Sequence, residues 1–111
     1  MNTMKEIFNL NDLKAFYDEN ADALHIVKIG APWCGPCRTL SDVLHNLDSD
    51  KIGATMIGEV DIDKEGADDI VSEYGVRSVP VTLFIKNSKL IEKKVGTIPV
   101  DEIYNKIEEY K

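Results

Sequence analysis

The only two thiols of this 111-residue chain, Cys34 and Cys37, are separated by two residues. In a reducing compartment, a pair at this spacing is more often redox-active or metal-binding than a structural staple. The pair follows the apolar run 24–29 and precedes apolar residues spaced three and four apart, a pattern typical of an amphipathic helix. Cys34 is therefore expected at a helix N-terminus, where free N–H groups and the helix dipole favour a thiolate.

Cys37 is expected one turn further along the same side, within reach of disulfide geometry. Pro36 is tolerated there because a first-turn N–H has no helical partner. We predict that Cys34 attacks a substrate disulfide and that Cys37 resolves the mixed disulfide. Two alternatives remain. A zinc site would need two more ligands. The only histidines are poorly placed to supply them, because His25 lies within an expected strand and His45 lies more than two helical turns beyond Cys37. A structural disulfide would close too short a loop to constrain the unfolded chain much.

The composition narrows the classes of partner. The net charge of −7 repels phosphate backbones and argues against nucleic-acid binding. No stretch has the ~20 apolar residues of a membrane span, and the N-terminus lacks a basic segment followed by an apolar one. We therefore expect a cytoplasmic monomer without membrane attachment, formed by a single domain over residues 1–111.

Hydrophobic periodicity alternates between that of strands and that of helices. The expected strands are 5–8, 24–29, 54–60, 81–86 and 89–95, and the expected helices are 12–19, 34–47, 67–74 and 99–110. Gly75 should end the third helix, and Asn87-Ser88 should form a two-residue hairpin turn. Thr97 is expected to cap the last helix and Pro99 to open it. Strands joined through helices favour an α/β fold with a parallel sheet covered on both faces, and the hairpin should add antiparallel strands at one edge.

Three sequence elements resemble the thioredoxin family, and the resemblance covers nearly the whole chain. They are Trp33-Cys34-Gly35-Pro36-Cys37, Arg77-Ser78-Val79-Pro80 and Val95-Gly96. The resemblance implies a thioredoxin-like fold, whose central mixed five-stranded sheet is flanked by helices on both faces. It also implies a protein-disulfide reductase without a bound cofactor, whose electrons reside in the Cys34–Cys37 pair. Disulfide-containing proteins would be its substrates, and an NADPH-dependent flavoprotein, a thioredoxin reductase, would supply the electrons.

The same resemblance implies a groove for an extended peptide. In the family, the proline matching Pro80 is cis and faces the cysteines, and the residue matching Val79 offers backbone groups to the substrate. From the residues alone, a cis bond at Pro80 is permitted but not required. The glycine matching Gly96 keeps the rim low. The groove would be lined by Trp33, Gly35, Pro36, Val79, Pro80, Val95 and Gly96.

The chain departs from the family at a pair of charges. Lys28 stands where the family usually has a buried aspartate, and Glu59 stands where it usually has a lysine. One base and one acid within apolar strands should pair, because a lone buried charge is very costly. We hypothesise that Glu59, held by Lys28, takes the proton of Cys37 through a water. The alternatives are a structural ion pair, a lysine whose amine reaches solvent, and a Lys28 charge that stabilises the Cys37 thiolate directly.

Three further departures concern the walls around the cysteines. Gly30 replaces a common aromatic residue, Asp42 replaces a helix-kinking proline, and Val81 replaces a threonine that often follows the cis proline.

Because fold does not fix function, a binding module without redox turnover is an alternative function. A better-stabilised dithiol would also make the potential less negative, which would favour an oxidase- or isomerase-like role.

Overall fold

A computed structural model describes residues 2–111. Its elements follow in the order β1 (Lys5–Glu6), α1 (Leu10–Asp18), β2 (Leu24–Gly30), α2 (Gly35–His45), α3 (Ser49–Ile52), β3 (Met56–Asp61), α4 (Ala67–Glu73), β4 (Val81–Lys86), β5 (Lys89–Val95) and α5 (Val100–Tyr110). The strands form one sheet in the order β1-β3-β2-β4-β5. The strands β1, β3 and β2 run parallel, whereas β4 and β5 are antiparallel to their neighbours. The expected mixed five-stranded sheet is confirmed.

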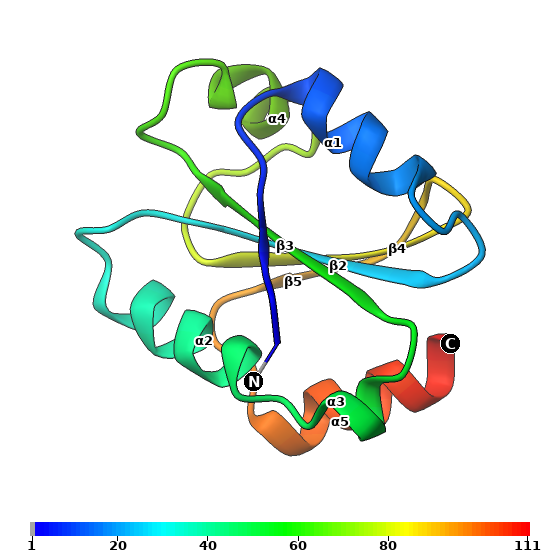
Figure 1. The fold of residues 1–111 in the computed structure, drawn as a ribbon. Coiled ribbons are helices and arrows are strands. Elements are labelled where there is room, and N and C mark those ends of the chain that lie inside the picture. The colour runs from blue at the N-terminus through cyan, green and yellow to red at the C-terminus, as the bar shows by residue number, and fades with distance from the viewer. Residues whose placement is uncertain (1) are drawn as a thin grey trace.

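Helices cover both faces of this sheet, with α1 and α4 on one side and α2, α3 and α5 on the other (Figure 1). Successive side chains of each strand point to opposite faces of the sheet and so pack into the two helical layers in turn. From β2, Val27 and Ile29 pack with the α1 and α4 layer, and Leu24 and Ile26 pack with the opposite layer. The central strand β2 is buried along its whole length, as expected for a strand covered on both faces.

Several expected boundaries are wrong. The strand expected at 5–8 ends at Glu6, the helix expected from residue 12 begins at Leu10, and the helix expected to reach residue 47 ends at His45. The short helix α3 was not expected, because four residues are too few to show a helical period. Its N-cap Asp48 accepts a hydrogen bond from the Asp50 N–H at 2.9 Å.

The start of α5 also differs from the expectation. Pro99, with an extended backbone, is the N-cap of α5 and not its first helical residue. Thr97 lies two residues before this N-cap and makes no side-chain capping bond. A proline nitrogen carries no hydrogen, so its fixed φ suits the helix entrance while the first-turn N–H groups stay without a side-chain cap.

Two turn predictions are confirmed. Asn87 and Ser88 both adopt positive φ, of 52° and 63°, as a two-residue hairpin turn of this hand requires. Gly75 follows α4 with a φ of 61°, the left-handed conformation that ends helices and that glycine adopts without steric penalty.

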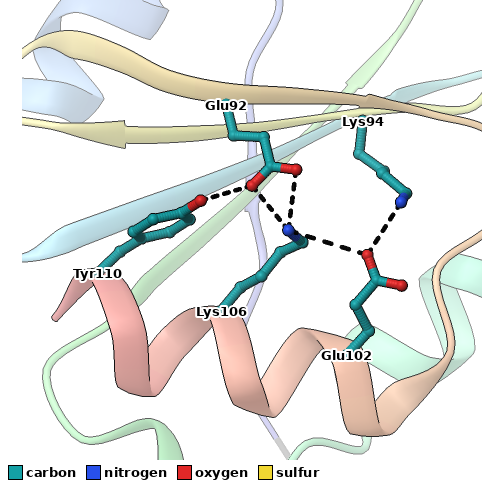
Figure 2. A network of polar contacts seen from close by, with 5 residues as sticks. All are labelled: Glu92, Lys94, Glu102, Lys106 and Tyr110. Carbon is teal, nitrogen blue, oxygen red and sulfur yellow. Dashed lines mark hydrogen bonds and ion pairs between the residues drawn. The ribbon is translucent and has the colours of Figure 1, made fainter.

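A network of charged and hydrogen-bonded side chains joins α5 to β5 (Figure 2). Lys106 donates to both carboxylate oxygens of Glu92, at 2.7 and 2.8 Å, and the Tyr110 hydroxyl donates to Glu92 at 2.6 Å. Lys94 and Glu102 form a neighbouring ion pair at 3.1 Å. The network fastens the last helix over the edge strand of the sheet.

Candidate active site

The two cysteines lie where β2 gives way to α2, and a disulfide joins them. Their Cα atoms are 5.2 Å apart, within the usual range for a disulfide. Cys34 is the N-cap of α2, and its sulfur accepts a hydrogen bond from the Cys37 N–H at 3.2 Å. Pro36 occupies the first turn of the helix, as predicted. The first-turn N–H groups and the helix dipole thus point toward the Cys34 sulfur.

The two sulfur-bearing residues differ in their access to solvent. Cys34 is 8% exposed, whereas Cys37 is completely buried. Only the first cysteine can therefore meet a sulfur of another protein without rearrangement of the helix.

A rim of separate segments lies beside Cys34. The Val79–Pro80 peptide bond is cis, and the Val79 carbonyl lies 3.9 Å from the Cys34 sulfur. The Gly96 N–H donates to the Pro80 carbonyl at 2.8 Å, which holds the end of β5 beside the start of β4. Because a cis bond was permitted but not required by the residues alone, only the folded chain settles this geometry.

Large apolar side chains stand exposed on the same rim. Trp33 is 67% exposed and Val95 is 58% exposed. The indole N–H of Trp33 donates to the Asp63 carboxylate at 2.9 Å, which fixes the ring despite its exposure. Asp63 was not among the predicted site residues. Its only sequence signal is its place two residues after the end of β3.

The register of the sheet brings the predicted charges together. Lys28 of β2 pairs with Glu59 of β3, so both side chains lie on the face that carries α2. The Lys28 Nζ and Glu59 Oε2 atoms are 4.0 Å apart. Ser41 of α2 lies between them: Lys28 donates to its hydroxyl at 2.7 Å, and the hydroxyl donates to Glu59 at 3.0 Å. Burial lowers the pKa of Lys28, and the charges of Glu59 and Asp61 oppose part of that effect.

Sequence reasoning missed Ser41, although a usable signal existed. Ser41 follows Cys37 by four residues, and residues four apart share one helix face. Thr82 was missed as well. It pairs with Lys28 from the other neighbouring strand, and its buried hydroxyl has no hydrogen-bond partner within residues 2–111.

Because Gly30 has no side chain, the Lys28 side chain has room behind the cysteines. A β-carbon at Gly30 would lie 2.8 Å from Lys28 Cε and 3.0 Å from the Cys37 sulfur. An aromatic side chain at this position would occupy the space that the lysine and the sulfur take. The departures at Gly30 and Lys28 are therefore sterically linked.

The histidines take no part in this site. Both ring nitrogens of the buried His25 face backbone carbonyls, of Ala23 and Glu19, at 3.1 and 2.9 Å. His45 ends α2. Within the described part of the chain, no three or more His, Cys, Asp or Glu side chains gather where they could hold a metal ion. None of the helices between residues 2 and 111 has the length and apolar character to cross a membrane.

Comparisons with known proteins agree with this site. The family model described as Thioredoxin matches residues 8–109. Thioredoxin 2 of Chlorobaculum tepidum is 34% identical over 91 residues, covering 82% of each chain. A thioredoxin of Mycoplasmoides gallisepticum is 35% identical over 100 residues, covering 90% of this chain and 95% of the other.

Solved structures give the same result. The thioredoxin structure of Fasciola hepatica superposes with a TM-score of 0.86 at 27% identity, covering 97% of this chain and 100% of the other. The chain belongs to the thioredoxin family, and its Cys34–Cys37 pair makes it a thiol–disulfide oxidoreductase.

Proposed function

We propose that the chain is a general protein-disulfide reductase in which Cys34 attacks and Cys37 resolves. The observation that carries this proposal is the pairing of a partly accessible Cys34 at a helix N-terminus with a fully buried Cys37. The Cys34 thiolate bonds to one substrate sulfur, the substrate S–S bond breaks, and the other sulfur leaves with a proton from solvent. The Cys37 thiolate then bonds to Cys34 and releases the second substrate sulfur. Two electrons pass from the dithiol to the substrate.

Substrate would bind as an extended peptide across the rim. Trp33 and Val95 offer exposed apolar surface, and the Val79 carbonyl beside the Cys34 sulfur is placed to meet the backbone of a bound strand. Gly35, Pro36, Pro80 and Gly96 would form the low walls of the same rim. Because backbone groups supply much of the binding in this mode, many substrates would be accepted.

The electrons would come from an NADPH-dependent flavoprotein reductase, as the family resemblance implies. The chain would act as a cytoplasmic monomer with no bound cofactor. A reducing compartment suits this role, because there the Cys34–Cys37 pair is returned to its dithiol form after each cycle. The departure at Asp42, which is exposed, would affect which reductase recognises the surface, whereas Gly30 and Val81 are buried.

Trapping with single-cysteine variants tests the proposed roles. Reduced Cys37→Ser should accumulate a stable mixed disulfide with insulin through Cys34, whereas Cys34→Ser should form none and should reduce no insulin. A stable adduct through Cys37 in the Cys34→Ser variant would reverse the roles. If the doubly substituted protein still retained its partner proteins as well as the parent does, the chain would be a binding module.

The reduction potential separates a reductase from an oxidase or isomerase. Equilibration in graded dithiothreitol buffers, followed through Trp33 fluorescence, should give a two-electron transition near the thioredoxin value of about −270 mV. A value close to about −180 or −120 mV, as in the isomerase and oxidase relatives, would contradict the reductase proposal.

A further inference from the structure

A hydrogen-bonded path leads from Lys28, near the buried cysteine, to Glu59. Lys28 Nζ and Glu59 Oε2 are too far apart for a direct hydrogen bond, at 4.0 Å, since such bonds rarely exceed about 3.2 Å. The Ser41 hydroxyl closes the gap, accepting from Lys28 at 2.7 Å and donating to Glu59 at 3.0 Å. Ser41 is thus the only observed hydrogen-bonded link from the amine to the carboxylate among residues 2–111.

The Lys28 side chain, at the inner end of this path, lies near Cys37. Lys28 Cε and the Cys37 sulfur both lie within 3.0 Å of the point that a Gly30 β-carbon would occupy, so they are no more than about 6 Å apart. Lys28 is 7% exposed, and burial lowers the pKa of its amine. An amine so placed exchanges protons more readily than a solvated lysine.

The outer end of the path reaches solvent. Glu59 and Ser41 line an open hollow of about 400 Å³ between α2 and the edge of the sheet, and the Glu59 side chain is 29% exposed. The other charged groups facing this hollow come from β1, β3, α2 and the loop after β3, and they are Glu6, Asp61, Arg38, Asp42 and Lys64. A proton that reaches Glu59 can therefore pass to water.

We propose that Ser41 is a positioning residue that relays the proton of Cys37 from Lys28 to Glu59 during resolution of the mixed disulfide. The Lys28 ammonium gives a proton to Ser41 Oγ while the Ser41 hydroxyl proton passes to Glu59 Oε2. The resulting neutral amine takes the proton of the Cys37 thiol through a bridging water, and the S–H bond breaks. The Cys37 thiolate then bonds to the Cys34 sulfur, the Cys34–substrate S–S bond breaks, and the substrate sulfur leaves. Glu59 then returns its proton to water in the hollow. This relay rests on the proposed roles of the two cysteines.

Stopped-flow kinetics of the reduced protein with excess insulin test the relay. Trp33 fluorescence should report mixed-disulfide formation, which depends on insulin concentration, and then resolution, which does not. In Ser41→Ala the resolution phase should slow on the order of tenfold at pH 7, and its pH profile should move to higher pH. Ser41→Thr, which keeps the hydroxyl, should restore the parent rate and profile.

Thr39→Ala is the matched control, because it removes an exposed hydroxyl from the same helix, and it should behave as the parent does. Thermal melting confirms that each variant is folded. A Ser41→Ala variant with the parent resolution rate and pH profile would overturn the relay. The relay would also be overturned if Ser41→Ala slowed the resolution phase equally at every pH and Ser41→Thr did not restore it, because the slowing would then be an effect of packing. A parent chain that reduces no insulin would overturn the proposed function and the relay together.

Discussion

Gly30 lies directly against Cys37, because a β-carbon on this glycine would come within 3.0 Å of the cysteine sulfur. Real β-carbons rarely approach other atoms so closely, and overpacking a core typically costs about 1–3 kcal/mol. Gly30→Ala should therefore lower the free energy of unfolding of the oxidised protein by about 1–3 kcal/mol, measured by urea denaturation. Gly35→Ala is the control: its β-carbon would meet nothing within 4 Å. Equal losses in both variants would contradict the steric argument.

Lys28→Met should make the reduction potential more negative. The Lys28 Cε atom, which carries the ammonium, lies no more than about 6 Å from the Cys37 sulfur, and a cation beside a thiolate stabilises it, which favours the dithiol. Removing it should shift the potential by on the order of 10–30 mV, measured in graded dithiothreitol buffers at pH 7. Lys14→Met is the control, since Lys14 is exposed on α1, across the sheet. An unchanged potential in Lys28→Met would show that the lysine charge does not reach the thiolate.

Thr82→Val should stabilise the protein. The Thr82 hydroxyl is buried and has no hydrogen-bond partner within residues 2–111, and valine has nearly the same shape. Removing an unsatisfied buried hydroxyl should raise the free energy of unfolding by about 1 kcal/mol, measured by urea denaturation. Thr97→Val, at an exposed loop position, should change it by less than about 0.5 kcal/mol. A loss of stability in Thr82→Val would reveal a partner such as a buried water.

Glu92→Gln should make the stability of the protein fall less as the pH is lowered into the acid range. Hydrogen bonds from Lys106 and then Tyr110 lower the pKa of Glu92 below its usual 4.5. The folded state therefore gains stability above pH 4.5 and loses it as the pH falls through the lowered pKa. Because Glu92 is partly exposed, the difference should stay below about 1 kcal/mol, measured by thermal melting between pH 6 and 3. A parent and a variant that lose stability in parallel would contradict it.

Ionisation of the Tyr110 phenol should weaken the same network at alkaline pH. Its hydrogen bond to Glu92 raises the pKa of Tyr110 to about 12. The folded state thus favours the neutral phenol, and this contribution is lost as the pH rises from 10 toward 12. Tyr110→Phe should show a smaller fall in melting temperature over that range. If the melting temperature of Tyr110→Phe fell as steeply as that of the parent, ionisation of the phenol would not be the cause of the loss.

The thiol chemistry and the local elements could be predicted from the amino-acid sequence alone. The two cysteines at a helix start, the alternation of strand and helix, the Asn87-Ser88 turn and Gly75 all depend on residues close together in the chain. Periodicity, capping and turn preferences act over a few residues, so these features were predictable. Helix boundaries were less predictable, because weak capping preferences decide where the first and last turns lie, as at Thr97 and Pro99 before α5.

The way in which distant side chains combine depends on how the chain packs in three dimensions. The charges of Lys28 and Glu59 were visible in the sequence, but the strand register places them side by side, and Ser41 joins them only because α2 packs on that face. The space beside Gly30 and the unsatisfied hydroxyl of Thr82 likewise depend on packing between segments remote in sequence. Register and packing are set by the burial of whole faces rather than by local preference, and for that reason the place of Ser41 between the two predicted charges was not predictable from the sequence.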